Sequence, residues 1–146
     1  MTRRVSVERD VLIVVCGISA GIHAALAPEH FREGLGAGLG FLLATGALAG
    51  LVVALTRTTG PSALALAALT LAGLLVAWTL AVTAGVPLLH PETEPPDGLA
   101  VATKAIEALG LVVAAHLLVR GRDADSARTE RTPTWTHVRT ARSHSD

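Results

Sequence analysis

Four long apolar stretches limit what this chain can fold into, and they cover residues 11–27, 34–56, 62–84 and 99–119. The first three contain no Lys, Arg, Asp or Glu, and the fourth carries only Lys104 and Glu107. An α-helix needs about 20 apolar residues to cross the roughly 30 Å hydrocarbon core of a bilayer. Lipid offers no hydrogen-bond partner to the backbone, and the stretches lack the alternating pattern of membrane β-strands. The sequence therefore predicts an all-α polytopic membrane protein, a bundle of four transmembrane helices joined by short loops.

The composition fits a membrane protein and argues against several soluble classes. Charged residues make up 16% of the 146 residues, against about 25% in ordinary soluble domains. Because the formal net charge is zero and aromatic residues are only 3%, we expect no nucleic-acid partner. The single cysteine, Cys16, excludes an intramolecular disulfide and a cysteine-rich zinc site. No serine lies in a nucleophile-elbow pattern, which favours a protein that is not an enzyme.

The arginines predict the orientation of the bundle. They occupy positions 3, 4, 9 and 57 and six positions after residue 119, all on one side of a four-span topology, whereas the loops of the other side hold only Arg32. By the positive-inside rule, we expect a multi-pass plasma-membrane protein whose N-terminal segment, residues 1–10, and tail, residues 120–146, are cytoplasmic. The tail has few apolar residues, so we expect it to be disordered. We expect Pro28 to end the first span, because proline breaks a helix interior.

Ionisable residues gather on the predicted extracytoplasmic side, in two loops and the helix ends beneath them. From the helical rise, His23 lies about 6 Å and Glu107 about 13 Å below the interface, where an unpaired charge is costly. Imidazoles and carboxylates are ligands of divalent transition metals, and helix bundles build such sites from facing helices. Packing of the two outer hairpins would bring these groups together. The sequence therefore predicts a site for Cu, Zn or Fe with the candidate ligands His23, His30, Glu33, Glu94, Asp97 and Glu107.

The same residues also suit other roles. Lys104 lies three residues before Glu107 on the same helical face and is its nearest partner, and His23 can donate to a backbone carbonyl. Glu33 suits the first turn of a helix, where the dipole favours a carboxylate. A third interpretation treats His23 and Glu107 as a proton path through the membrane.

Three functions follow from these interpretations. The first is a membrane protein that binds a divalent transition metal. The second is a non-catalytic accessory subunit of a larger membrane complex, and the third is a small proton-coupled carrier or membrane oxidoreductase. Besides the lipid bilayer, glycine pairs such as Gly46 and Gly50 favour contacts with a second copy of the chain or with a larger complex.

Short motifs in the sequence resemble those of a known group. They are Gly21-Ile22-His23, the stretch from Pro28-Glu29-His30 to Gly34, and an acidic proline loop, Glu94-Pro95 with Asp97, followed by Glu107. In these motifs the chain looks like small uncharacterised four-span integral membrane proteins of high-GC actinobacteria, and the single lysine of the chain fits that source. The resemblance implies a four-span fold and a membrane location, and it implies no reaction.

Overall fold

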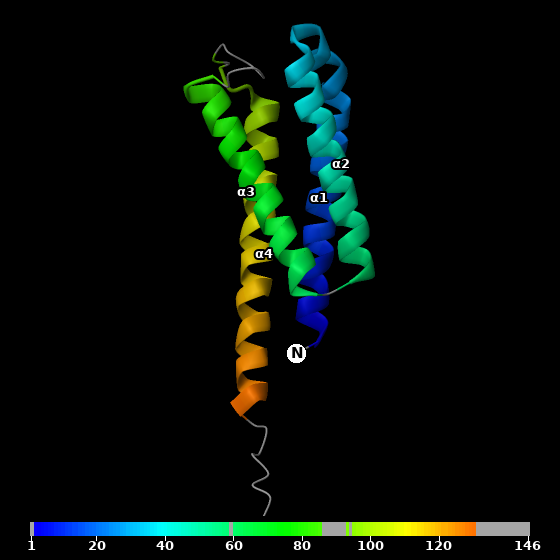
Figure 1. Cartoon of the computed structure of the whole chain (residues 1–146), viewed down its shortest axis with the longest axis vertical. Helices are drawn as coiled ribbons and strands as arrows, with labels where there is room; N and C mark the ends of the chain where they lie inside the picture. Colours follow the sequence, from blue (N-terminus) through cyan, green and yellow to red (C-terminus); the bar gives the residue numbers. More distant parts are fainter. Residues whose placement is uncertain (1, 59, 86–92, 94, 131–146) are drawn as a thin grey trace, which may run out of the picture.

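The computed structural model describes residues 2–58, 60–85, 93 and 95–130, and it confirms the four-helix prediction. The helices are α1 (Thr2–Glu33), α2 (Leu35–Arg57), α3 (Pro61–Thr83) and α4 (Gly98–Glu130), and the described residues contain no strand (Figure 1). Each helix contains a segment long and apolar enough to cross a membrane. The four apolar helices therefore support a membrane protein.

Two helices extend beyond the predicted spans. Pro28 lies inside α1, which continues to Glu33 and ends where Gly34 takes an extended backbone. A proline deprives the helix of one backbone hydrogen bond, a loss that neighbouring helices make tolerable in transmembrane segments. At the other end of the chain we expected residues 120–146 to be disordered. Residues 120–130 instead continue α4, and residues 131–146 lie outside the described residues. Opposite charges recur there at helical spacing, as at Arg120 and Asp123, and this spacing stabilises helices.

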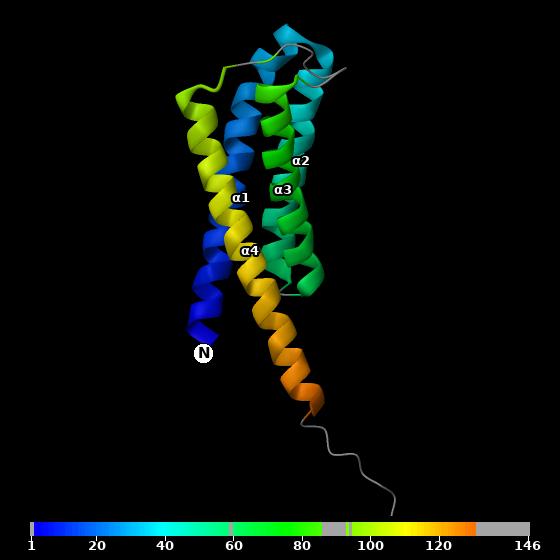
Figure 2. The same ribbon diagram turned by 90° about the vertical axis from the view of Figure 1, so that its left-hand side faces the viewer.

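The helices form a ring in which each packs against two neighbours. Among the described residues α1 contacts α2 and α4, and α3 contacts α4 and α2, while the α2–α3 contact is the least extensive. The N-terminus of α1 and the C-terminus of α4 lie at the same end of the bundle (Figures 1 and 2). We call the opposite end, where α1 meets α2 near Gly34 and α4 begins at Gly98, the distal end.

The apolar core fills the half of the bundle away from the distal end. It is built from leucine, alanine and the lone cysteine, among them Leu12, Cys16, Leu48, Leu51, Leu55, Ala67, Leu71 and Ala114. Large apolar side chains also cover the outside, and Leu43, Leu69 and Val112 are 66–74% exposed. A helix that is apolar on both its inner and outer faces suits lipid as its surroundings.

Two glycines mark the closest helix approaches in the described part of the chain. A β-carbon added at Gly110 of α4 would lie 2.6 Å from Val15 Cγ1 and 3.1 Å from Leu71 Cδ1. A β-carbon at Gly38 would meet the ring of Phe31. By contrast, one added at Gly46 or Gly50 would meet no atom within 4 Å. Within the chain, close packing therefore depends on Gly38 and Gly110 rather than on the repeated glycine pairs.

Candidate functional site

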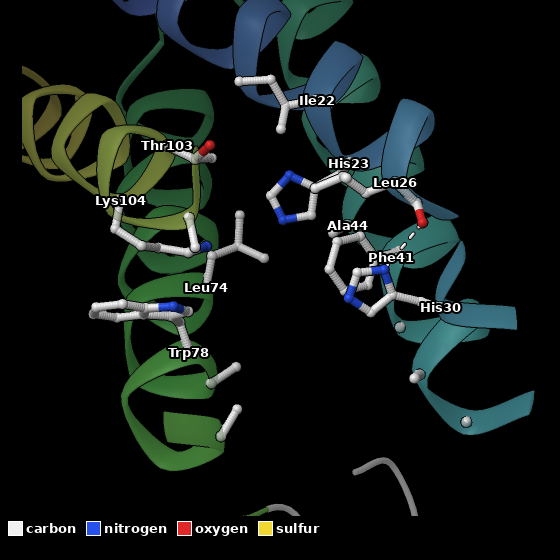
Figure 3. Close-up of a pocket in the computed structure, with 16 residues that line it drawn as sticks. Ile22, His23, Leu26, His30, Phe41, Ala44, Leu74, Trp78, Thr103 and Lys104 are labelled. Carbon is white, nitrogen blue, oxygen red and sulfur yellow. Dashed lines mark hydrogen bonds between the residues drawn. The ribbon is translucent and has the colours of Figure 1, made fainter. Parts of the chain in front are cut away.

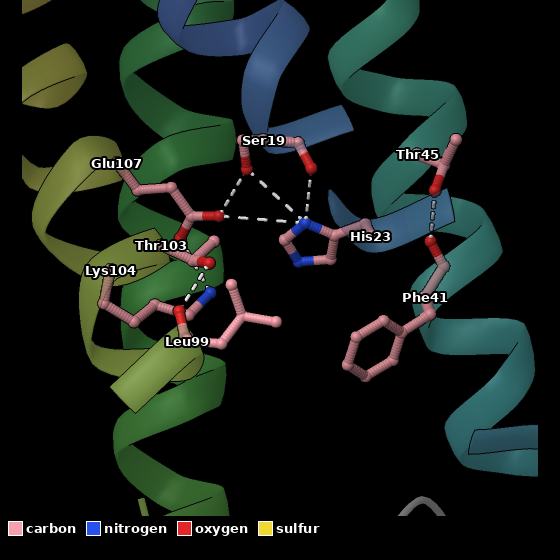
Figure 4. Close-up of polar contacts among 8 residues, drawn as sticks. All are labelled: Ser19, His23, Phe41, Thr45, Leu99, Thr103, Lys104 and Glu107. Atoms are coloured by element: carbon pink, nitrogen blue, oxygen red, sulfur yellow. Dashed lines mark hydrogen bonds and ion pairs between the residues drawn. The ribbon is translucent and has the colours of Figure 1, made fainter. Parts of the chain in front are cut away.

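A fully buried carboxylate lies inside the bundle on α4. Glu107 has no solvent exposure, and its two oxygens have different partners (Figure 4). The Ser19 hydroxyl of α1 donates to Oε1 at 2.6 Å, and Lys104 Nζ donates to Oε2 at 2.7 Å. The predicted Lys104–Glu107 pair is thus confirmed. Charge-assisted hydrogen bonds of this length are the strong class, and they offset part of the cost of burying the carboxylate.

His23 completes this group from α1. Its Nδ1 lies 2.9 Å from the Ser19 carbonyl oxygen and 3.9 Å from Glu107 Oε1. A carbonyl oxygen only accepts, so Nδ1 carries the hydrogen and donates it, and Nε2 of the neutral ring is an acceptor. Within the described residues, Nε2 has no hydrogen-bond partner. We call Ser19, His23, Lys104 and Glu107 the Glu107 cluster.

A cavity of about 240 Å³ lies beside this cluster in the distal half of the bundle (Figure 3). All four helices line it, and its polar groups are two imidazoles, one ammonium, one hydroxyl and one indole N–H. The lining residues that carry these groups are His23, His30, Thr103, Lys104 and Trp78. No carboxylate is among the described residues that line the cavity. Ser19 and Glu107 lie behind its wall, so Lys104 and His23 belong to both the cluster and the cavity.

Phe41 separates the two histidines of the cavity. The His30 ring stacks on Phe41 with a centroid distance of 3.6 Å, and the His23 ring lies 5.3 Å from Phe41 in a tilted arrangement. Nδ1 of His30 donates to the Leu26 carbonyl at 3.0 Å, which repeats the arrangement of His23 two turns earlier. Seven residues of helix place the two Cα atoms about 10.5 Å apart along the axis. The histidines therefore face different parts of the cavity.

The candidate metal ligands lie in separate places rather than in one cluster. Glu107 lies with His23, while His30 Nε2 is 3.9 Å from Glu33 Oε2, as expected for residues three apart on one helical face. Asp97 accepts a hydrogen bond from the Ala100 amide at 2.6 Å and so caps the start of α4. Glu94 lies outside the described residues. Across residues 2–58, 60–85, 93 and 95–130, no three His, Cys, Asp or Glu side chains are grouped to hold a metal ion.

No family model, curated protein or solved structure matches this chain. The resemblance to actinobacterial four-span proteins therefore stays a prediction. The assignment of a function rests on the geometry of the Glu107 cluster and of the cavity.

Several residues of this site were missed by sequence reasoning. Ser19 lies four residues before His23 on the same face of α1, which is the signal that would have placed it beside the imidazole. Phe41 and Trp78 carried no such signal, because an aromatic residue inside an apolar span looks like any core residue. Their place in the cavity depends on how α2 and α3 pack around α1 and α4.

A second polar contact joins α1 and α4 at the opposite end of the bundle. Glu8 Oε1 lies 3.8 Å from His116 Nδ1 and 3.7 Å from Arg120 Nη1. His116 is half exposed and lies four residues before Arg120 on α4. These contacts are too exposed and too far from the cavity to form part of the candidate site.

Proposed function

We propose that this protein is a small membrane carrier that couples the movement of a solute to a proton, with Glu107 as the proton-binding group. The observation that supports the proposal is a fully buried carboxylate, held by Ser19 and Lys104 in the middle of an apolar helix, next to a cavity. Ionisable residues inside membrane spans are rare and costly, and they mark proton and substrate paths.

A purely structural role explains this arrangement poorly. Replacing a buried ion pair with well-packed apolar residues is often neutral or stabilising, because desolvating two charges offsets their attraction. Lys104 of this pair lines the cavity, so its ammonium is not packed against protein on every side. We therefore attribute the presence of the Lys104–Glu107 pair to a role in binding a proton and a solute rather than to a contribution to stability.

The charges of the cluster supply a coupling mechanism. When Glu107 is ionised, its charge cancels that of Lys104, and the pair is neutral. A proton on Glu107 leaves Lys104 with an uncompensated positive charge at the cavity wall, which then pairs with one negative charge on a solute. Among the described residues, the other groups close to Glu107 are Ser19 and His23, both from α1. Proton and anion enter together because either charge alone is costly in a medium of low dielectric constant.

A flux assay with a permanently charged anion tests this proposal. The purified protein is reconstituted into liposomes that contain a pH-sensitive dye, and sodium octanesulfonate is added outside. A sulfonate stays ionised near neutral pH, so it carries no proton across lipid by itself. We expect internal acidification with the wild-type protein, none with Glu107→Gln, and wild-type acidification with Glu29→Gln, whose carboxylate is exposed and pairs with Arg32. A wild-type signal no larger than that of empty liposomes would reject the carrier.

The orientation remains a proposal as well, with both ends of the chain in the cytoplasm. The arginine distribution supports it. In a Cys16→Ala background, Gly34→Cys at the distal end should react with an impermeant maleimide in intact cells. Gly60→Cys, at the opposite end of the bundle, should react only after the cells are permeabilised. The reverse pattern would place the distal end in the cytoplasm.

A further inference from the structure

We infer that the cavity binds a single-chain amphiphile with an anionic head group, the head at Lys104 and His23 and the chain against the apolar wall. The inference rests on the proposed function, because the bound molecule is the transported one and a proton on Glu107 frees Lys104 to pair with its head group.

The polar lining of the cavity selects for a negative head group. Lys104 Nζ has three N–H donors, and in the described contacts one of them goes to Glu107. None of the described residues that line the cavity carries a carboxylate, and Glu107 lies behind its wall. In Figure 3 the Lys104 ammonium and the His23 ring both point into the space between the two helical hairpins. A cationic ligand would meet the Lys104 ammonium and no carboxylate among the described lining residues, which disfavours it.

The rest of the lining selects for an apolar chain. Apart from Phe41, Leu74 and Trp78, the lining residues of α2 and α3 are small, namely Gly36, Ala37, Gly40, Ala44, Ala77 and Ala81. These two helices also have the least extensive contact in the ring, and the two hairpins separate toward the distal end (Figure 1). The cavity is partly open, so a chain longer than the cavity can extend beyond it.

The size of the cavity selects for one chain rather than two. Its volume of about 240 Å³ is smaller than the roughly 300–1,000 Å³ of typical small-molecule pockets. A space of this size holds a head group with the first part of one chain, and it does not hold two chains side by side. Phe41 and Trp78 add flat apolar surfaces on opposite sides of the same space (Figure 3). The favoured class is therefore a medium-chain or long-chain carboxylate or sulfonate.

Fluorescence quenching at Trp78 tests the binding directly. The chain has two tryptophans, so Trp135→Phe leaves Trp78, in the cavity wall, as the only one. The protein is placed in lipid nanodiscs and titrated with 11-bromoundecanoate, whose bromine quenches indole fluorescence on contact. We expect saturable quenching that octanesulfonate reverses by competition. The methyl ester of the same acid lacks the charge, and we expect it to bind at least about tenfold more weakly.

A matched pair of glycine variants locates the site. A β-carbon at Gly40, in the cavity wall, or at Gly46, outside the cavity, would meet no atom within 4 Å. Gly40→Leu should fill the cavity and abolish saturable quenching, and Gly46→Leu, on the same helix, should preserve it. Equal quenching in both variants would overturn the assignment to the cavity. Comparison of circular dichroism spectra shows that both variants are folded.

Three further outcomes separate the alternatives. Saturable quenching by a brominated phosphatidylcholine would identify a bilayer lipid as the occupant and reject a single-chain ligand. Equal affinity for the acid and its ester would reject recognition of the anionic head. Saturable, charge-dependent quenching without internal acidification in the liposome assay would support this inference and reject the carrier function.

Discussion

Replacing Glu107 alone should destabilise the bundle far more than replacing Glu107 and Lys104 together. In Glu107→Leu, the Lys104 ammonium keeps its buried position, with its side chain only 12% exposed, but loses its carboxylate partner. Removing one member of a buried ion pair costs about 3–5 kcal/mol, because the remaining charge is left uncompensated. Lys104→Met should cost a similar amount, since the fully buried Glu107 then keeps only the Ser19 hydroxyl as a hydrogen-bond partner.

The double variant Lys104→Met/Glu107→Leu removes both charges and replaces them with apolar groups of similar size. Its free energy of unfolding should lie near the wild-type value or exceed it by about 1–4 kcal/mol. The coupling energy between the two sites then has a magnitude of at least about 6 kcal/mol, well above the 0.5–3 kcal/mol range typical of residues in contact. The variant Ser19→Ala measures the effect of losing one hydrogen bond in the same cluster, for comparison with the loss of a charge. Hydrogen bonds between membrane helices average about 0.6 kcal/mol and reach about 1.7 kcal/mol.

Reversible unfolding in mixed micelles of a mild detergent and sodium dodecyl sulfate measures all four variants, with helix content followed by circular dichroism. Independent losses in the two single variants, adding up in the double variant, would refute the pairing of Lys104 with Glu107. The same double variant also separates stability from function. It should fold as well as the wild type and should show no octanesulfonate-driven acidification, because neither the proton-binding group nor the anion-binding group is present.

Three further predictions concern other parts of the bundle. Gly110→Ala should lower the free energy of unfolding by about 1–3 kcal/mol, because its β-carbon meets the stiff side chain of Val15. Gly46→Ala should raise it by about 0.5–1 kcal/mol, and chemical unfolding measures the free energy of both variants. Asp97→Ala should cost about 0.5–2 kcal/mol by removing the cap of α4, measured in the same way. If the metal prediction holds, elemental analysis of purified protein should show a bound transition metal that is lost in His30→Ala and Glu33→Ala. A wild-type protein that contains no metal would refute the metal prediction.

The four helices were predictable because length and hydropathy together decide which segments cross a bilayer. Hydropathy no longer predicts where helices lie outside the hydrocarbon region. The first ten residues and residues 120–130 are polar, and their helicity in α1 and α4 depends on local charge spacing and on continuation of an existing helix. The prediction that Pro28 ends the first span was wrong for a related reason. Its cost in a helix interior is real, but a long membrane helix accommodates it.

The local part of the candidate site was also predictable. The Lys104–Glu107 and His30–Glu33 pairs follow from a spacing of three residues on a helix. The hydrogen bond from Ser19 to Glu107 joins residues 88 positions apart, and no periodicity indicates which turn of α1 faces which turn of α4. The predicted meeting of the two outer loops depended on the same missing information. Asp97 caps its own helix instead, because a backbone amide three residues away is the nearest donor.

The residues of the Glu107 cluster lie in two different surroundings, and this placement connects Glu107 to the cavity. Ser19 and Glu107 lie in the α1–α4 contact, out of reach of a ligand, whereas His23 and Lys104 also form part of the cavity wall. The proposed anion would therefore contact Lys104 directly and would interact with Glu107 only through it. In the proposed carrier, the single positive charge of Lys104 interacts both with the Glu107 carboxylate and with the bound anion. Protonation of Glu107 removes the first interaction, so Lys104 then binds the anion more strongly. By reciprocity, a bound anion favours the protonated form of Glu107 to the same extent, and one lysine is enough to couple the two events.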